Sequence, residues 1–158
     1  MTEVAINKSS EKKEKIVKTV GVVVFDGKGN VLVVRHGDRA RVREGIYGLP
    51  AGHQNEAETA RQAAARELKE EAGIEVLETS LREFPGNYFE GKIELKDRTE
   101  KANYTVFLAP NFNGEIFGEE GKTKPEWISV KDLNLLYPTL PNVSEVVQNA
   151  GKFLNEQS

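Results

Sequence analysis

Hydrophobic residues occur in short runs that are separated by turn residues along most of the chain. Val20–Phe25 and Val31–Arg35 are valine-rich runs, which predict buried strands. The segment between them, Asp26–Asn30, has the sequence Asp-Gly-Lys-Gly-Asn, which is typical of turns. The two strands are therefore expected to form a hairpin. Further strands are expected at Leu81–Phe84, Lys92–Leu95, Asn103–Leu108 and Glu126–Ser129.

Two segments show helical periodicity instead. Thr59–Ala72 predicts a helix that is ended by Gly73, a glycine at the C′ position. A packed C-terminal helix is predicted by apolar residues at helical spacing, namely Val143, Val146, Val147, Ala150, Phe153 and Leu154.

The segment between the second strand and the first helix has no such periodicity. Residues 36–48 contain several arginines and three glycines, and we expect them to form a loop. The sequence of elements predicts an α/β fold with a mixed β-sheet.

The polar positions divide the chain into two parts. Residues 1–15 have no apolar periodicity and are expected to be a mobile polar tail. Residues 16–158 contain no internal repeat and no linker, so they are expected to form a single domain.

Composition narrows the classes of function. The net charge of −3 argues against a general nucleic-acid binder. The chain has no cysteine, which excludes disulfides, zinc–thiolate sites and thiol nucleophiles. No apolar run approaches the roughly 18 residues of a membrane span. We expect a cytoplasmic protein, monomeric or homodimeric, whose partner is a small molecule rather than nucleic acid or a membrane.

Acidic residues have an unusual position on the predicted helix. At about 100° per residue, Glu67, Glu70 and Glu71 flank the apolar stripe that contains Ala64 and Leu68, rather than lying on the outer face. These three glutamates are i, i+3 and i+4 neighbours, so their charges repel one another. Stability alone does not explain this placement, whereas a bound hard cation such as Mg²⁺ or Mn²⁺ does. The competing interpretation is a helix that merely carries many glutamates.

The segment from residue 52 to residue 74 strengthens the metal interpretation. It fits Gly-x5-Glu-x7-Arg-Glu-U-x-Glu-Glu-x-Gly-U, where U is a bulky aliphatic residue, without departure. The fixed positions are Gly52, Glu58, Arg66, Glu67, Leu68, Glu70, Glu71, Gly73 and Ile74. The segment resembles the signature of the Nudix hydrolases, and a chance match is on the order of one in a million. The resemblance implies an α/β/α sandwich with a loop–helix–loop metal site.

The resemblance also implies roles for single residues. Glu67, Glu70 and Glu71 match metal-binding carboxylates, and Gly52 matches a glycine whose carbonyl supplies a further ligand. Glu58 and Arg66 match a pair that braces the loop against the helix. The implied cofactor is Mg²⁺ or Mn²⁺, which would lower the pKa of a water that attacks phosphorus.

The general base has two candidates. Glu67 is the candidate inside the signature. Gly118–Gly121, followed by Glu126–Ser129, is similar to a later part of MutT-type nucleoside triphosphatases, where a loop acid reaches the metal site. Glu120 stands at the matching place, and the alternative is that it is an ordinary surface acid.

Substrate-binding residues are indicated on both sides of the signature. Arg35, Arg39, Arg41 and Arg43 are close together in the sequence, and Arg35 is the preferred phosphate ligand because it ends a strand that leads towards the signature. The alternative is a solvated loop. Asn142 resembles the asparagine that MutT-type enzymes present to a purine, if one extra residue is allowed. The alternative for Asn142 is a helix N-cap before Val143.

These observations predict a metal-dependent pyrophosphohydrolase that cleaves a nucleoside diphosphate linked to another group. The preferred substrate is a nucleoside triphosphate, cleaved to the monophosphate and pyrophosphate. The alternatives are ADP-ribose, a sugar nucleotide or a coenzyme A-type substrate. A nucleotide-sensing domain without catalysis, and an unrelated interaction module with an acidic helix, are further alternatives.

Overall fold

The structure is a computed structural model that describes residues 15–157. Apart from Lys15, the predicted tail at residues 1–15 lies outside the described residues. The elements are β1 (Ile16–Val23), β2 (Asn30–His36), β3 (Tyr47–Gly48), β4 (Ala51–His53), α2 (Ala60–Ala72), η1 (Glu78–Ser80), β5 (Tyr88–Glu94), β6 (Thr99–Leu108), β7 (Thr123–Ser129), η2 (Val130–Leu135) and α3 (Val143–Gln157).

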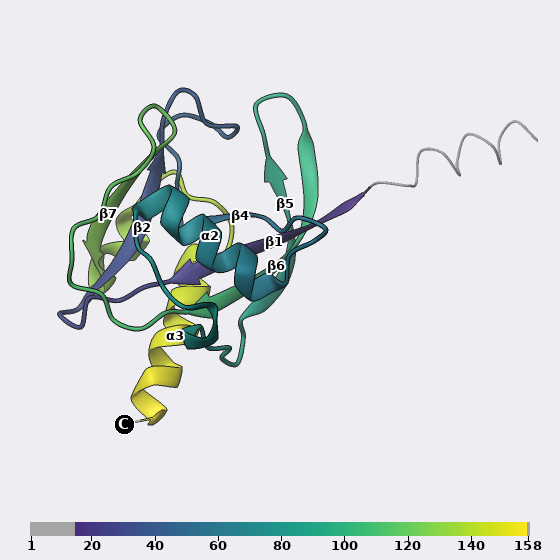
Figure 1. Cartoon of the computed structure of the whole chain (residues 1–158). Coiled ribbons are helices and arrows are strands. Elements are labelled where there is room, and N and C mark those ends of the chain that lie inside the picture. The colour runs from purple at the N-terminus through teal and green to yellow at the C-terminus, as the bar shows by residue number, and fades with distance from the viewer. Residues whose placement is uncertain (1–14, 158) are drawn as a thin grey trace, which may run out of the picture.

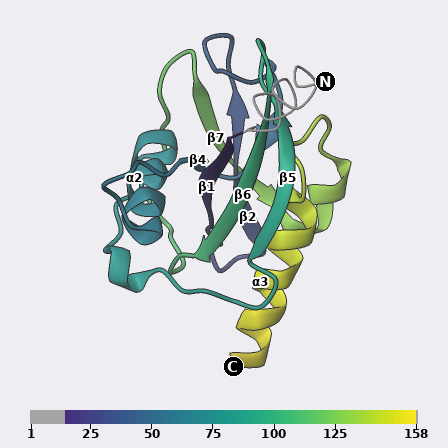
Figure 2. The same ribbon diagram turned by 90° about the vertical axis from the view of Figure 1, so that its right-hand side faces the viewer.

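The strands form two sheets that lie between α2 and α3 (Figures 1 and 2). One sheet has the order β4-β1-β6-β5 and the other has the order β3-β2-β7. β1 and β6 are parallel, whereas the other paired strands are antiparallel. This arrangement confirms the predicted α/β/α sandwich with mixed β-structure.

The turn between β1 and β2 forms as predicted. The Asp26 carboxylate accepts the backbone N–H of Lys28 at 2.7 Å and that of Asn30 at 3.1 Å. A bridge between Phe25 and Val31 closes the turn. Such a side-chain-stabilised turn is what the Asp-Gly and Gly-Asn sequence favours.

The predicted hairpin beyond that turn is wrong. β1 pairs with β4 and β6, whereas β2 pairs with β3 and β7, so the two strands diverge into different sheets. Val22–Val24 and Val31–Val34 are fully buried, as expected for strands covered on both faces. Their pairing is decided by strands far along the chain, and a local turn signal contains no information about those partners.

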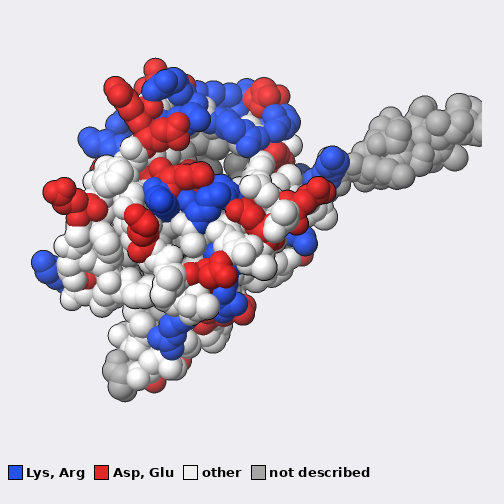
Figure 3. All heavy atoms as spheres, viewed as in Figure 1, with Lys and Arg blue, Asp and Glu red and all other residues white. Residues whose placement is uncertain are grey.

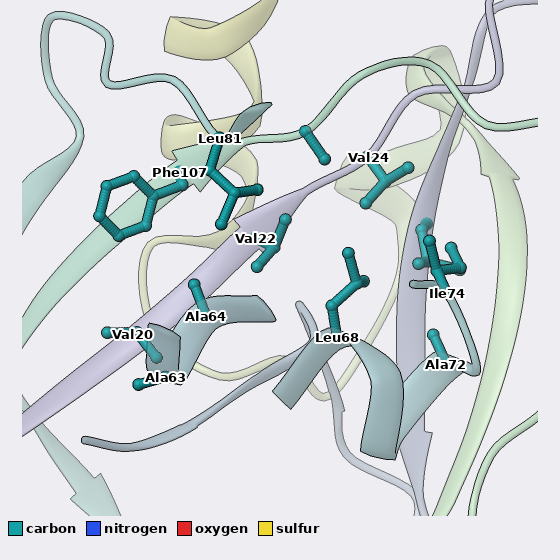
Figure 4. Close-up of a cluster of buried hydrophobic side chains, with 12 residues drawn as sticks. Val20, Val22, Val24, Ala63, Ala64, Leu68, Ala72, Ile74, Leu81 and Phe107 are labelled. Carbon is teal, nitrogen blue, oxygen red and sulfur yellow. The ribbon is translucent and has the colours of Figure 1, made fainter. Parts of the chain in front are cut away.

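α2 packs on the four-stranded sheet through its alanine-rich face. Figure 4 shows Ala63 and Ala64 of α2 close to Val20 of β1, Leu68 further along the helix, and Ala72 beside Ile74. The buried members are Val20, Val22, Val24, Leu32, Ala63, Ala64, Leu68, Ala72, Ile74, Leu81, Phe107 and Ala109. Three of the four buried apolar residues of α2 are alanines, and these small side chains let the helix approach the sheet closely. The helix edge that carries the glutamates is thereby held beside β4, the neighbour of β1.

Both ends of α2 agree with the expectation. Thr59 is the N-cap, and its side chain accepts the Gln62 N–H while the Gln62 side chain accepts the Thr59 N–H. Gly73 adopts a left-handed conformation with φ of 73° and donates its N–H to the Lys69 carbonyl. Glycine reaches this conformation without a steric penalty, which is why the helix ends there.

The C-terminal helix is also confirmed, as α3. Val143, Val146, Val147 and Ala150 are buried in a second core with residues of both sheets, including Val33 and Val106. None of the helices within residues 15–157 is long and apolar enough to cross a membrane.

Some strand predictions need correction. Leu81–Phe84 is not a strand, although Leu81 and Phe84 are buried and Arg82 forms an isolated bridge with Leu108. The strands predicted near Lys92, Asn103 and Glu126 exist, but each begins three or four residues earlier than expected. The first residues of β6 and β7 are polar or partly exposed, and β5 begins with Tyr88 and Phe89 followed by Glu90 and Gly91, so none of the three starts with a buried apolar run.

Candidate active site

A cavity of about 460 Å³ lies beside β4 and α2. One part of its wall is acidic and contains Glu67, Glu70, Glu71 and Glu119. Another part is mostly apolar and contains Val42, Phe89, Ile93, Leu95, Tyr104, Val106 and Leu140. A volume of this size suits a small-molecule ligand. The cavity therefore offers one ligand both a charged and an apolar environment.

Gly52 and Glu67 fit together at the acidic part. Gly52 is on β4, and a Cβ atom built there would overlap the Glu67 carboxylate. Glu67 is buried, and burial is the largest cause that raises its pKa. A glycine at position 52 is therefore what allows a carboxylate to be buried against the backbone of β4.

Arg66 connects the signature loop to the helix. Its Nε atom donates to Glu58 Oε2 at 2.6 Å, and its Nη2 atom donates to Glu58 Oε1 and to the His53 carbonyl, each at 2.9 Å. The same guanidinium donates to Glu67 Oε2 at 2.8 Å. The hydrogen bond from Arg66 lowers the pKa of Glu58 to about 2. The structure thus brings Glu58 and Arg66 together in a geometry suited to bracing.

Glu71 and Glu70 have different environments. Glu71 is partly buried and accepts the Ala51 N–H at 2.9 Å. Burial is the largest cause that raises the pKa of Glu71 to about 8, and the nearby charges of Glu67, Glu70 and Glu119 act in the same direction, against the Ala51 hydrogen bond. Glu70 is exposed and lies 3.4 Å from an Arg66 nitrogen. A cation at this place would relieve the repulsion among the carboxylates.

The loop acid on the cavity wall is Glu119 rather than Glu120. Glu119 lines the cavity, and its charge contributes to the raised pKa of Glu71. Glu120 is exposed and is not among the lining residues, and its backbone carbonyl accepts a hydrogen bond from Arg39. Gly121 turns the chain with φ of 81° directly after it. The loop predicted to supply an acid thus reaches the cavity through Glu119, whereas Glu120, the residue named in the prediction, does not line it.

The arginine predicted to bind phosphate also lies away from the cavity, whereas two other arginines line it. Arg35 is exposed and does not line the cavity, whereas Arg39 and Arg41 do. On β2, Arg35 is in register with Tyr47 of β3 and Lys124 of β7, and neither of these neighbours lines the cavity. Figure 3 shows basic and acidic side chains interleaved on the face that carries α2. The loop after β2 thus contributes two arginines to the cavity wall, in addition to Arg66 of α2 and Lys122.

Asn142 stands at the start of α3. Its carbonyl accepts the Val146 N–H at 3.0 Å, and its side-chain amide donates to Glu145 Oε1 at 2.9 Å. It has φ of 65° and is exposed. Pro141 and Val143 line the cavity but Asn142 does not, so the structure does not bring this asparagine to the site predicted for it.

Several lining residues were not found from the sequence. Glu100 accepts hydrogen bonds from Arg41 at 3.4 Å and Arg98 at 3.1 Å, and it contacts His53 Nε2 at 3.0 Å. These contacts lower the pKa of Glu100 even though burial alone would raise it. Glu100 is 59 residues from Arg41 along the chain, and no local pattern connects them.

Phe89 is an aromatic residue of the cavity wall. Its ring stacks on that of Tyr104 with a centroid distance of 4.8 Å and an interplanar angle of 19°. Tyr88, the residue before it, is exposed and donates its hydroxyl to Glu90 at 3.2 Å. Alternation along β5 explains why only one of these neighbours reaches the cavity.

Comparison with known proteins agrees with the site. A sequence model of the NUDIX domain matches residues 15–150. The chain therefore belongs to the NUDIX family.

The individual proteins that this chain resembles share limited sequence identity with it. A MutT protein from Methanosarcina mazei is 20% identical with a TM-score of 0.72, over 92% of this chain and 98% of that one. The NUDIX domain of Shewanella oneidensis NrtR, solved with ADP ribose, is 17% identical with a TM-score of 0.72, over 98% and 99% of the chains. The 8-oxo-dGDP phosphatase NUDT18 of Danio rerio is 38% identical over 63 residues, which are 40% of this chain but only 19% of that protein.

Proposed function

We propose that this Nudix hydrolase cleaves a nucleoside triphosphate to the monophosphate and pyrophosphate, with Mg²⁺ or Mn²⁺ as cofactor. The observation that carries the proposal is that the four glutamates of the acidic part and a mostly apolar wall with aromatic rings share one cavity. A nucleotide would match these two parts. Its phosphates would bind through a cation at the acidic part, and its flat base would lie against the mostly apolar wall.

The residues of the acidic part fit a hard divalent cation. Glu67, Glu70, Glu71 and the Gly52 carbonyl would hold it, with Glu119 close by. Within residues 15–157, no three histidine, aspartate or glutamate side chains converge closely enough to enclose an ion alone. Mg²⁺ does not need such an enclosure, because it usually keeps several waters and binds one or two carboxylates together with substrate phosphates. When bound, the ion would neutralise phosphate charge and acidify the attacking water.

Other tasks belong to side chains of the chain itself. Arg39 and Arg41 contact the phosphates from the loop after β2, as guanidinium groups are suited to do. Glu119 accepts the proton of the attacking water, because it lines the cavity and is not among the residues that would hold the ion. Lys122 lies 3.3 Å from the Glu119 carboxylate.

The proposal is tested by product analysis on a nucleotide panel with Mg²⁺, with and without EDTA. The panel contains nucleoside triphosphates, 8-oxo-dGDP, ADP-ribose, a sugar nucleotide and coenzyme A. We expect nucleoside monophosphate and pyrophosphate from a triphosphate, and no product with EDTA. Faster cleavage of ADP-ribose or coenzyme A than of every triphosphate would contradict the substrate class. ADP-ribose binding without turnover of any compound would favour the sensing alternative.

A further inference from the structure

Glu119 lines the cavity although its side chain has little to hold it there. The side chain is 56% exposed, and Lys122, on the same loop, lies 3.3 Å from the carboxylate. An ion pair between two exposed side chains fixes a geometry only weakly, because water screens it. The direction of Glu119 therefore depends mainly on the backbone of its loop.

Thr123, the first residue of β7, binds the backbone of Glu119 on both sides. The Glu119 N–H donates to Thr123 Oγ1 at 2.9 Å, and the Thr123 N–H donates to the Glu119 carbonyl at 2.9 Å. The Lys122 N–H donates to the same carbonyl at 2.9 Å. Both backbone polar groups of residue 119 are therefore bonded within the turn from residue 119 to residue 123.

Two glycines allow this closed turn. A Cβ atom at Gly118 would overlap the carbonyl and hydroxyl oxygens of Thr123. Gly121 has φ of 81°, a conformation that glycine adopts without a steric penalty. Gly118 thus lets Thr123 approach closely, and Gly121 reverses the chain so that the hydroxyl reaches the Glu119 N–H.

The remaining residues of the turn are bound to the loop after β2. The Gly37 N–H donates to the Lys122 carbonyl at 2.9 Å, and the Arg39 N–H donates to the Gly121 carbonyl at 2.8 Å. The Arg39 guanidinium donates to the Glu120 carbonyl. These contacts fix residues 120–122, whereas the N–H of residue 119 is bound by the Thr123 hydroxyl.

We propose that Thr123 is a positioning residue for Glu119, whose carboxylate it keeps directed at the attacking water in the cavity. A general base acts only within hydrogen-bond reach of the proton that it accepts, and a misplacement of about 1 Å can lower a rate about 100-fold. The competing interpretation is that the hydroxyl only stabilises the turn. The inference rests on the proposed function, because it assumes that Glu119 is the base.

The test compares Thr123→Val, which keeps the shape of the side chain and removes the acceptor, with Thr123→Ser, which keeps the hydroxyl. For the triphosphate with the highest kcat/KM, Thr123→Val should lower kcat about tenfold and change KM less than about twofold. Thr123→Ser should stay within about twofold of the wild-type kcat. A wild-type kcat in Thr123→Val, or an equal loss in both variants, would overturn the inference.

A double-mutant cycle separates positioning from a structural role. In the Glu119→Gln background, Thr123→Val should lower kcat by less than about a further twofold, because a carboxylate that has been removed cannot be misplaced. A structural role would lower kcat by the same factor in both backgrounds. That additive outcome would overturn the inference.

Amide hydrogen exchange of the metal-free protein tests the contact without catalysis. The Glu119 N–H should exchange about tenfold faster in Thr123→Val than in the wild type and Thr123→Ser. Equal exchange in all three proteins would overturn the inference. Failure of the proposed function has a different pattern, namely faster exchange in Thr123→Val together with an unchanged kcat in Glu119→Gln. That pattern would overturn the role of Glu119 as base, and with it the catalytic role of Thr123.

Discussion

Glu119 is a residue whose role depends on the direction of one side chain. Two adjacent acids follow Gly118, and only the first lines the cavity. We predict that Glu119→Gln lowers kcat by about 10²–10⁴-fold, the range for a lost general base, with a much smaller change in KM. Steady-state kinetics with Mg²⁺ provides the measurement, and Glu120→Gln is the matched control. A large loss in Glu120→Gln with none in Glu119→Gln would mean that the loop is turned the other way.

Glu71 illustrates the cost of placing carboxylates together. Its pKa in the metal-free fold is raised to about 8 from an ordinary 4.5, so the folded state favours the protonated form. Between these two values the folded protein binds more protons than the unfolded chain, and its stability falls as the pH rises.

We therefore predict that Glu71→Gln raises the melting temperature of the metal-free protein at pH 8 and has little effect near pH 4.5. The amide oxygen of the introduced glutamine would still accept the Ala51 N–H, so the hydrogen bond is kept. Melting curves in EDTA across this pH range provide the measurement. A lower melting temperature at pH 8 would contradict the assigned direction of the pKa shift.

Among the secondary-structure elements, α2 carries three of the four glutamates of the acidic part. The ends and the packing of this helix therefore determine where those glutamates lie. We predict that Thr59→Ala lowers the free energy of unfolding by about 1 kcal/mol, because it removes the side-chain half of the capping box. Thr59→Ser keeps the hydroxyl and should be close to the wild type. Urea unfolding of the three proteins provides the measurement, and an equal loss in both variants would assign the effect to the methyl group.

The sequence predicted elements better than their partners. The limits of α2 were predictable because Thr59 and Gly73 are local signals, and the alanine stripe repeats at helical spacing. The separation of β1 from β2 was not, since it depends on β6 and β7, which lie far along the chain. Strand alternation likewise decides that Phe89 rather than Tyr88 reaches the cavity.

At the scale of the whole molecule, the cavity combines segments that are distant in sequence. The signature predicted Glu67, Glu70 and Glu71 of its acidic part, because these three are neighbours on one helix, whereas Glu119 comes from a later loop. Thr19, Arg41 and Glu100 come from three other segments, and only the fold brings them to the cavity. Sequence position alone also did not show that Arg39 and Arg41, in the loop after β2, line the cavity while Arg35, within β2, does not.

The proposed function requires that the acidic part of the cavity is a metal-dependent hydrolytic centre. The most direct measurement is the rate of pyrophosphate release from the preferred triphosphate with Mg²⁺, for the wild type, Glu70→Gln and Glu71→Gln. Glu75→Gln is the control, because Glu75 is exposed just beyond α2 and does not line the cavity. We predict losses of about 100-fold or more at positions 70 and 71, an unchanged rate at position 75, and no release by any protein in EDTA. Wild-type rates in both glutamine variants, or full activity in EDTA, would contradict the account.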